Sequence, residues 1–318
     1  MKWSDKSAGI GLVIWVLAAI SLRPSLFELP WGQLLLLLAA LVLIPLALDL
    51  LVPRGASRRW RWLVVCQFPA AVLLVASFAM PQGIAAVTLA APWALITALL
   101  SWCGLARAWR AGWRPGDRLF PPDLCVSAGM IFLSIGGAWL IAARAGLRPM
   151  GFDPVIVLLT AIHFHYAGFL LPVLTGLAVR RRPDRLARMA CLGVMAGVPL
   201  TAIGITTTQM GLSPWIETMA AWITVMAGWM AALLHFRLAR DQAYAAPARV
   251  LWNVMALSLT LSMALAFLYA ARAHAPLAWL DIPPPDIPWM RALHGTANAI
   301  GFGLCGVLAW RIAMRQQG

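Results

Sequence analysis

Two histidines and a tyrosine lie close together inside a long apolar run of the sequence. His163, His165 and Tyr166 fall within the stretch from Pro154 to Val179, which is long enough to cross a bilayer. Imidazole and phenol groups are costly to bury in hydrocarbon unless they find hydrogen-bond partners or water. Imidazole also transfers protons near neutral pH, so this stretch is the first candidate for acid–base chemistry.

Further polar side chains are expected near the ends of neighbouring apolar runs, on one side of the membrane. The set comprises Asp153, Thr206, Thr207, Gln209, Glu217, His294 and Asn298. His294 and Asn298 are four residues apart and therefore share a helix face. We expect these groups and the two earlier histidines to line a cavity in the non-cytoplasmic half of the bilayer, reaching its midplane.

Acid–base chemistry suggests a role for each candidate. Glu217 is assigned as the general acid and His163 as the general base, with His294 and Asn298 as positioning groups. The catalytic candidates are His163, His165, Tyr166, Glu217, His294 and Asn298. The substrate-binding candidates are Asp153, Phe164, Thr206, Thr207, Gln209, Trp222 and Phe302. Four aromatic side chains would form walls that stabilise a developing cation, namely Phe164, Tyr166, Trp222 and Phe302.

Simpler structural roles account for some of the same residues. A buried histidine in a membrane helix often only hydrogen-bonds a neighbouring helix. Glu217 follows Ser213-Pro214, so it is also placed to stabilise a helix N-terminus. Residues two apart on a helix point about 200° away from each other, so we expect one of His163 and His165 to face the cavity and the other a neighbouring helix.

The same geometry argues against a metal or cofactor. Two imidazoles on different helix faces are poorly placed to hold one metal ion, and we predict neither a metal site nor a cofactor. Haem ligation by His163 or His165 together with His294 is disfavoured by an expected difference in depth of about 8 Å.

The composition requires a membrane-embedded framework for these residues. Of the 318 residues, 62% are apolar and only 11% are charged, unlike a soluble domain. We expect an all-α, polytopic helix bundle that forms a single integral membrane domain over residues 1–318, with a weaker first part (1–150) and a motif-bearing part (151–318). The apolar runs predict about ten spans, at 8–22, 31–52, 62–80, 82–106, 124–143, 154–179, 187–207, 214–236, 248–271 and 290–313.

The first run is expected to be an uncleaved anchor, because Arg23-Pro24 follows it without a small-residue cleavage site. A proline-rich segment from 275 to 289 precedes the last run. It is expected to be extended, either as a plain linker or as a rigid lid on the outer side.

Arginine positions predict the orientation. Arginine clusters follow every even-numbered run, such as Arg180, Arg181 and Arg182 after the sixth, whereas the alternate loops carry few. The positive-inside rule then places both termini in the cytoplasm. The net charge of +14 is assigned to contacts with anionic membrane lipids and not to nucleic acid. The five cysteines are isolated, which predicts no disulfide framework.

Two patterns together resemble a known family. The segment His163-Phe164-His165-Tyr166-Ala167-Gly168-Phe169 and the later His294-Gly295-Thr296-Ala297-Asn298-Ala299-Ile300-Gly301-Phe302, with Asp281-Ile282-Pro283 before it, are similar to the YndJ-like family of bacterial membrane proteins. The resemblance covers the chain from about Gly151 onward. It implies a multi-pass protein of the bacterial inner membrane, sometimes labelled a transporter, and it carries no catalytic assignment to these positions.

Two classes of function remain open. In the first, an enzyme catalyses acid–base isomerisation, epoxide opening or cyclisation of a lipid-soluble substrate, such as an isoprenoid or a polyketide. In the second, a transporter couples cargo movement to protons or metal ions. Transport requires a second polar lining toward the cytoplasm and broken helices in matched repeats, which the sequence does not show clearly. The enzyme is therefore favoured, with a lipophilic small molecule and membrane lipids as its partners.

Overall fold

The computed structural model describes residues 3–52, 58–112, 121–273 and 285–316. Within these residues, ten helices are long and apolar enough to cross a membrane. They lie at Trp3–Leu22, Leu29–Leu51, Trp60–Ala79, Ile84–Arg110, Pro122–Ala145, Pro154–Arg181, Arg185–Gln209, Pro214–Ala239, Ala246–Ala270 and Ile287–Arg315. The predicted all-α, polytopic bundle of about ten spans is thus confirmed, and each predicted span overlaps one of these helices.

Several spans are built from more than one helical segment. The elements in chain order are α1 (Trp3–Leu22), α2 (Leu29–Leu38), η1 (Ala39–Leu43), α3 (Ile44–Leu51), α4 (Arg58–Ala79), α5 (Ile84–Gly112), α6 (Pro121–Ala145), η2 (Pro149–Gly151), α7 (Pro154–His163), η3 (Phe164–Leu170), α8 (Leu171–Arg181), α9 (Arg185–Gln209), α10 (Pro214–Ala239), α11 (Ala246–Ala270), η4 (Ala271–Ala273), α12 (Ile287–Trp289), η6 (Met290–Gly295), η7 (Ala297–Leu304) and α13 (Cys305–Arg315).

Side-chain caps fix where several helices begin. Asp153, Asp184, Ser213 and Asp286 each accept a hydrogen bond from a backbone N–H of the following turn. Such caps satisfy donors that the first helical turn leaves unpaired. The Asp286 cap starts the last span at Ile287, inside the segment that was predicted to be extended. The rest of that proline-rich segment, residues 274–284, lies outside the described residues.

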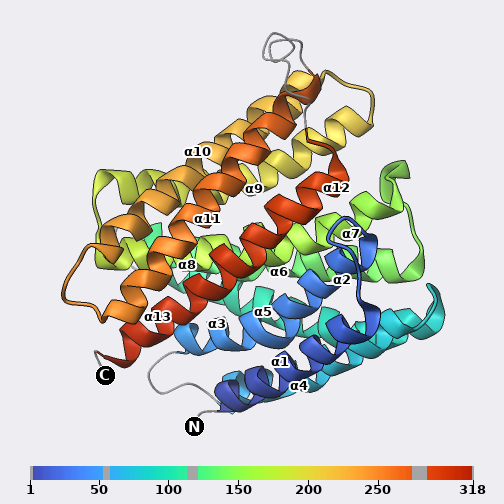
Figure 1. Cartoon of the computed structure of the whole chain (residues 1–318), viewed down its shortest axis with the longest axis horizontal. Helices are drawn as coiled ribbons and strands as arrows, with labels where there is room; N and C mark the ends of the chain where they lie inside the picture. Colours follow the sequence, from blue (N-terminus) through green and yellow to red (C-terminus); the bar gives the residue numbers. More distant parts are fainter. Residues whose placement is uncertain (1–2, 53–57, 113–120, 274–284, 317–318) are drawn as a thin grey trace.

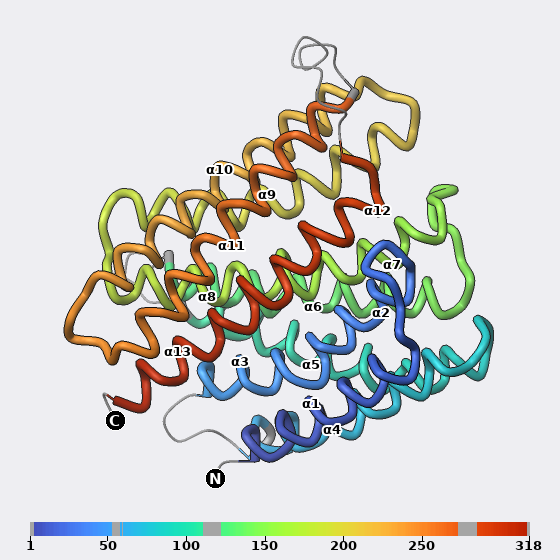
Figure 2. The backbone as a smooth tube through the Cα atoms, in the orientation of Figure 1, coloured from blue at the N-terminus to red at the C-terminus, as the bar shows by residue number. Residues whose placement is uncertain are grey.

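The second span is the centre of the bundle. In its most apolar stretch 94% of the residues are buried, compared with 17% for the first span. Figures 1 and 2 show α2 and α3 running between α1 and α13, and both of these helices pack against this span. A helix that is apolar on every face is expected to be enclosed by other helices.

Ion pairs join the two ends of the chain at one end of the bundle. Arg311 pairs with Asp5 at 2.5 Å and with Asp49 at 2.9 Å, and Arg315 pairs with Asp5 at 2.8 Å. Both termini therefore lie on the same side, as an even number of spans requires (Figure 1). That this side is cytoplasmic stays a prediction.

The two polar motifs lie on π-helical segments. The first motif occupies η3, and the second occupies η6 and η7. Leu171-Pro172 directly follows η3. Proline supplies no N–H to the carbonyl four residues earlier, so the hydrogen-bond register is free to shift there. π-Helical turns occur often at functional sites.

The sixth span changes neighbours along its length. Its first half, α7, packs on α2 and α6, while its second half, α8, packs on α6, α9 and α10. Figure 1 shows α9, α10 and α11 diverging from α6 and α7 toward the end where α12 begins.

Candidate functional site

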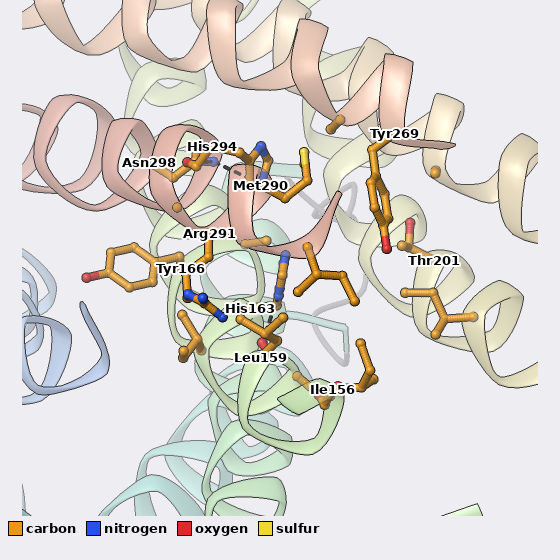
Figure 3. Close-up of a pocket in the computed structure, with 18 of the residues that line it drawn as sticks. Ile156, Leu159, His163, Tyr166, Thr201, Tyr269, Met290, Arg291, His294 and Asn298 are labelled. Atoms are coloured by element: carbon orange, nitrogen blue, oxygen red, sulfur yellow. Dashed lines mark hydrogen bonds between the residues drawn. The ribbon is translucent and has the colours of Figure 1, made fainter. Parts of the chain in front are cut away.

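A cavity of about 450 Å³ lies between α7, η3, α9, α10, α11 and η6. Figure 3 shows the side chains that converge on it. Most of the lining is apolar, as in typical small-molecule sites. Its polar and charged members are Thr160, His163, Tyr166, Thr201, Thr208, Gln209, Glu217, Tyr269, Arg272, Arg291, His294 and Asn298.

His163 and His294 face each other in this cavity. Their ring centroids are 6.1 Å apart, with 28° between the ring planes. Nδ1 of His163 lies 2.7 Å from the carbonyl oxygen of Leu159. A carbonyl only accepts, so Nδ1 carries the proton and Nε2 keeps its lone pair. Nε2 of His163 has no hydrogen-bond partner among the described residues, and Figure 3 shows this side of the ring extending toward His294.

His163 differs from two other histidines that share its local geometry. Nδ1 of His165 donates to Ala161 at 2.7 Å, and Nδ1 of His235 donates to Ala231 at 2.8 Å. Nε2 of each accepts a hydrogen bond from a tryptophan, Trp93 for His165 at 3.0 Å and Trp310 for His235 at 3.2 Å. Those two histidines are fully buried and fully satisfied, whereas His163 presents an unused acceptor to the cavity.

His294 is held by a network. Its Nδ1 donates to the carbonyl of Ser262 at 2.8 Å, and its Nε2 accepts from Nδ2 of Asn298 at 3.2 Å. The same Nδ2 donates to the His294 carbonyl at 2.9 Å, and Oδ1 of Asn298 accepts from the Ser262 hydroxyl at 3.0 Å. These contacts fix both the ring orientation and the tautomer, and they tie the last span to α11.

The sequence comparisons agree with the motif positions. The model of the YndJ-like protein family matches residues 34–302. The chain belongs to the YndJ-like family. A curated relative, the "Uncharacterized membrane protein YndJ" of Bacillus subtilis (strain 168), is 29% identical over 193 residues, which cover 60% of this chain and 33% of that protein. The chain thus spans about a third of that relative's length. No solved structure matches.

The YndJ-like match extends well before the motifs that predicted it. The resemblance was placed from about Gly151 onward, but the family match begins at residue 34, inside α2. The reason lies in the sequence of the second span. Its leucine-rich run holds no distinctive polar pattern, although it forms the buried centre of this YndJ-like bundle.

Glu217 lies at the cavity but is already paired. Its Oε1 accepts a hydrogen bond from Arg272 at 2.9 Å, and the Arg272 guanidinium also stacks 3.8 Å from the ring centroid of Tyr269. Glu217 thus serves as an ionised acceptor in a part-buried ion pair. This geometry gives the carboxylate a structural use and does not favour the predicted role of general acid.

Seven predicted residues line the cavity. For Tyr166, the hydroxyl is bound elsewhere. His163, Tyr166, Gln209, Glu217, His294, Asn298 and Phe302 belong to the lining. The Tyr166 hydroxyl donates to the Leu35 carbonyl at 2.7 Å. The Tyr166 hydroxyl is therefore bound to α2, and this contact does not favour a catalytic role for it. A catalytic role for the other lining residues stays a prediction.

Six predicted residues do not line the cavity. Asp153 caps α7 by accepting from the N–H of Val155. Thr206 and Thr207 bond carbonyls of their own helix, Ala202 and Gly204. Trp222 stacks on Phe267 with centroids 4.8 Å apart. Phe164 is buried and packs against Gly136 of α6, where an added Cβ would lie 3.0 Å from the Phe164 Cβ. His165 accepts a hydrogen bond from Trp93.

The cavity lining includes two arginines and four neutral polar residues that the sequence did not identify as site residues. Arg272 and Arg291 line the cavity, and in the sequence they belong to the alternate loops, which carry few arginines. That position was itself a signal, because the positive-inside rule gives no reason for arginines there. Thr160, Thr201, Thr208 and Tyr269 complete the polar lining, and only Thr160 had a visible helical relation to His163.

Within the described residues, no group of three or more His, Cys, Asp or Glu side chains is arranged to hold a metal ion. The expected difference of about 8 Å in depth between His163 and His294 is wrong, because the centroids of the two rings lie only 6.1 Å apart. The last span begins earlier than predicted and is π-helical at His294, which changes the position of that side chain.

Proposed function

We propose that this integral membrane protein is an isomerase that moves a proton within a lipid-soluble substrate, with His163 as the proton carrier. One observation carries the proposal: of the three described histidines with the same Nδ1 hydrogen bond to the preceding turn, only His163 has an Nε2 that no described residue contacts by a hydrogen bond. That atom faces a cavity large enough for a small molecule. A neutral imidazole with a free lone pair is a general base.

The charges around the cavity favour a developing anion over a developing cation. Arg272 is balanced by Glu217, but Arg291 also lines the cavity and adds positive charge. Two of the four predicted aromatic walls, Phe164 and Trp222, lie elsewhere. Positive charge near the reacting atoms stabilises an enolate-like transition state and opposes a carbocation. Proton-transfer isomerisation is therefore preferred to cationic cyclisation.

The proposed reaction needs one group that both takes and returns a proton. Nε2 of His163 removes a proton from a substrate carbon that is acidified by a neighbouring carbonyl, and the electron pair shifts through the conjugated system. The imidazolium then returns the proton to a different carbon, so the formula of the substrate is unchanged. His294, held by Asn298 at 3.2 Å, keeps the facing wall of the cavity in place.

The position of the cavity supports a substrate that reaches it through the lipid phase. His163 is the last residue of α7, which begins at Pro154, so it lies about 14 Å along the helix from that end. The likeness to a Bacillus subtilis membrane protein supports placement in the cytoplasmic membrane of a bacterium. The arginine pattern supports an orientation with both termini inside. The cavity then opens toward the non-cytoplasmic leaflet.

Lipid extracts from cells with and without the protein test the proposal. We expect a lipophilic species whose chromatographic retention changes while its mass does not, because isomerisation conserves the formula. His163→Gln abolishes the change. His235→Gln is the matched control, since it alters a histidine with the same local geometry at a tryptophan-filled site. Unchanged retention in all extracts, with only altered amounts on the two sides of the membrane, would favour transport and refute the isomerase.

A further inference from the structure

Arg291 is a buried cation that forms no hydrogen bond or close ion pair with the described residues. Its side chain lines the cavity and is only 7% exposed. Its Nε is fully buried and makes no hydrogen bond, and none of the ion pairs between described residues includes its guanidinium. In the interior of a membrane protein an unpaired charge is costly, so such a residue normally faces a ligand or a counter-charge.

The acidic groups near Arg291 are already in use. The Glu217 carboxylate pairs with Arg272 at 2.9 Å. Asp286, which begins the same span, accepts from the N–H of Trp289 at 2.9 Å. Asp286 attracts Arg291 electrostatically but forms no ion pair with it, so the guanidinium has no carboxylate within pairing distance among the described residues.

The packing of neighbouring helices leaves space for this side chain. A Cβ on Gly32 of α2 would lie 3.3 Å from Cδ of Arg291, so glycine at this position lets the arginine stem lie against α2. The stem is supported while the guanidinium reaches the cavity. Figure 3 shows Arg291 extending from the η6 ribbon toward the segment that carries Tyr166 and His163.

A second unpartnered polar group lines the same cavity. The Thr208 hydroxyl is buried and has no hydrogen-bond partner in the described structure. The two threonines before it bond carbonyls of their own helix, but Thr208 does not. A buried donor left without a partner costs free energy. The Thr208 oxygen itself has almost no accessible surface, so a ligand reaches it only after neighbouring side chains move.

We propose that the cavity binds a single-tailed amphiphile whose anionic oxygen head group pairs with Arg291. The guanidinium offers a planar fork of N–H donors that suits carboxylate or phosphate oxygens. Leu35, Leu159, Leu259, Met263 and Phe302 provide the apolar wall for the tail. A volume of about 450 Å³ matches a small-molecule ligand and not a two-chain lipid. This inference rests on the proposed function and specifies its substrate class as acidic.

A binding assay that needs no turnover tests the inference. The full chain in phosphatidylcholine nanodiscs is incubated with radiolabelled dodecanoate, and dodecanol, dodecyl phosphate and inorganic phosphate compete. We expect dodecyl phosphate to compete, dodecanol to compete at least tenfold less well, and inorganic phosphate not to compete. Arg291→Met lowers dodecanoate affinity at least tenfold, equal to about 1.4 kcal/mol, and Arg291→Lys lowers it less. Arg23→Met, an exposed arginine outside the cavity, leaves the affinity unchanged.

Equal competition by dodecanol, or unchanged dodecanoate affinity in Arg291→Met, would overturn the inference. Competition by inorganic phosphate as strong as that by dodecyl phosphate would overturn the role of the tail. His163→Gln retains dodecanoate binding, so the two proposals fail separately. Binding without isomerisation refutes the enzyme alone, and isomerisation confined to neutral lipids refutes the acidic head group alone.

Discussion

The imidazole rings of His163 and His294 face each other across one cavity, 6.1 Å apart between centroids. They come from the sixth and the tenth spans, and both belong to segments next to or within π-helical turns. His294 is held on both ring nitrogens, whereas His163 is held on one. Among the described residues, the His294 ring is therefore held in place, while Nε2 of His163 is available to accept a proton.

Asn298 is expected to act through His294. Asn298→Leu removes the donor to Nε2 and frees the ring to turn, so we expect the rate of isomerisation to fall about a hundredfold, as for a small misplacement of a catalytic group. The substrate concentration for half-maximal rate should change little. Ser262→Ala, which removes the hydroxyl bonds to Oδ1 of Asn298 and to the Leu259 carbonyl but keeps the donor to His294, should have a smaller effect. Equal rates in Asn298→Leu and the wild type would show that the network does not matter for the reaction.

The Glu217–Arg272 ion pair is expected to be structural. Glu217→Gln leaves Arg272, whose side chain is 33% exposed, without its counter-charge. The unfolding free energy is expected to fall by about 1–2 kcal/mol, a value between those typical of losing a surface ion pair and of breaking a buried one. Adding Arg272→Gln should recover part of it, which thermal unfolding of both variants would measure. Complete loss of activity in a stable Glu217→Gln protein would instead restore its role as general acid.

Arg291 is expected to reduce the stability of the ligand-free protein. Arg291→Met removes a buried charge that has no close ion pair and keeps an unbranched apolar stem, so the melting temperature should rise. Dodecanoate should stabilise the wild type and not this variant, because only binding to the folded state shifts its stability. A lower melting temperature in Arg291→Met would mean that the guanidinium has a stabilising partner.

Gly301 is expected to allow close packing of the last span on α11. A Cβ at this position would collide with the side chain of Ser258. Gly301→Ala should therefore destabilise the fold by about 1–3 kcal/mol, and Ser258→Gly in the same chain should relieve the collision. Gly9→Ala is the control, because no atom lies within 4 Å of the added Cβ. Equal melting temperatures for Gly301→Ala and Gly9→Ala would contradict close packing.

The sequence was sufficient for the framework. Lengths and ends of apolar runs predicted all ten spans, because lipid forces the backbone to bond within each helix. The position of Ser213-Pro214 also identified a helix start that the structure contains. Local rules suffice for such features, since capping and span length depend on residues close in the sequence.

The composition of the site was harder to predict. A regular helix was assumed for both motifs, but π-helical turns move His294 closer to His163 than depth alone suggested. Trp93 is a partner of His165 from a distant span, and no local pattern identifies that pairing. The role of Arg291 depends on what the other carboxylates already bind, which only the assembled bundle shows.

Exchange of solvent deuterium tests the central claim most directly. A proton held on His163 exchanges with water before it returns, so the isomerised lipid should acquire deuterium when the purified protein and lipid extract are incubated in D2O. We predict that His163→Gln lowers the rate of incorporation at least about a hundredfold while His235→Gln keeps the wild-type rate. Incorporation at the wild-type rate in His163→Gln, or none with the wild-type protein, would contradict the account.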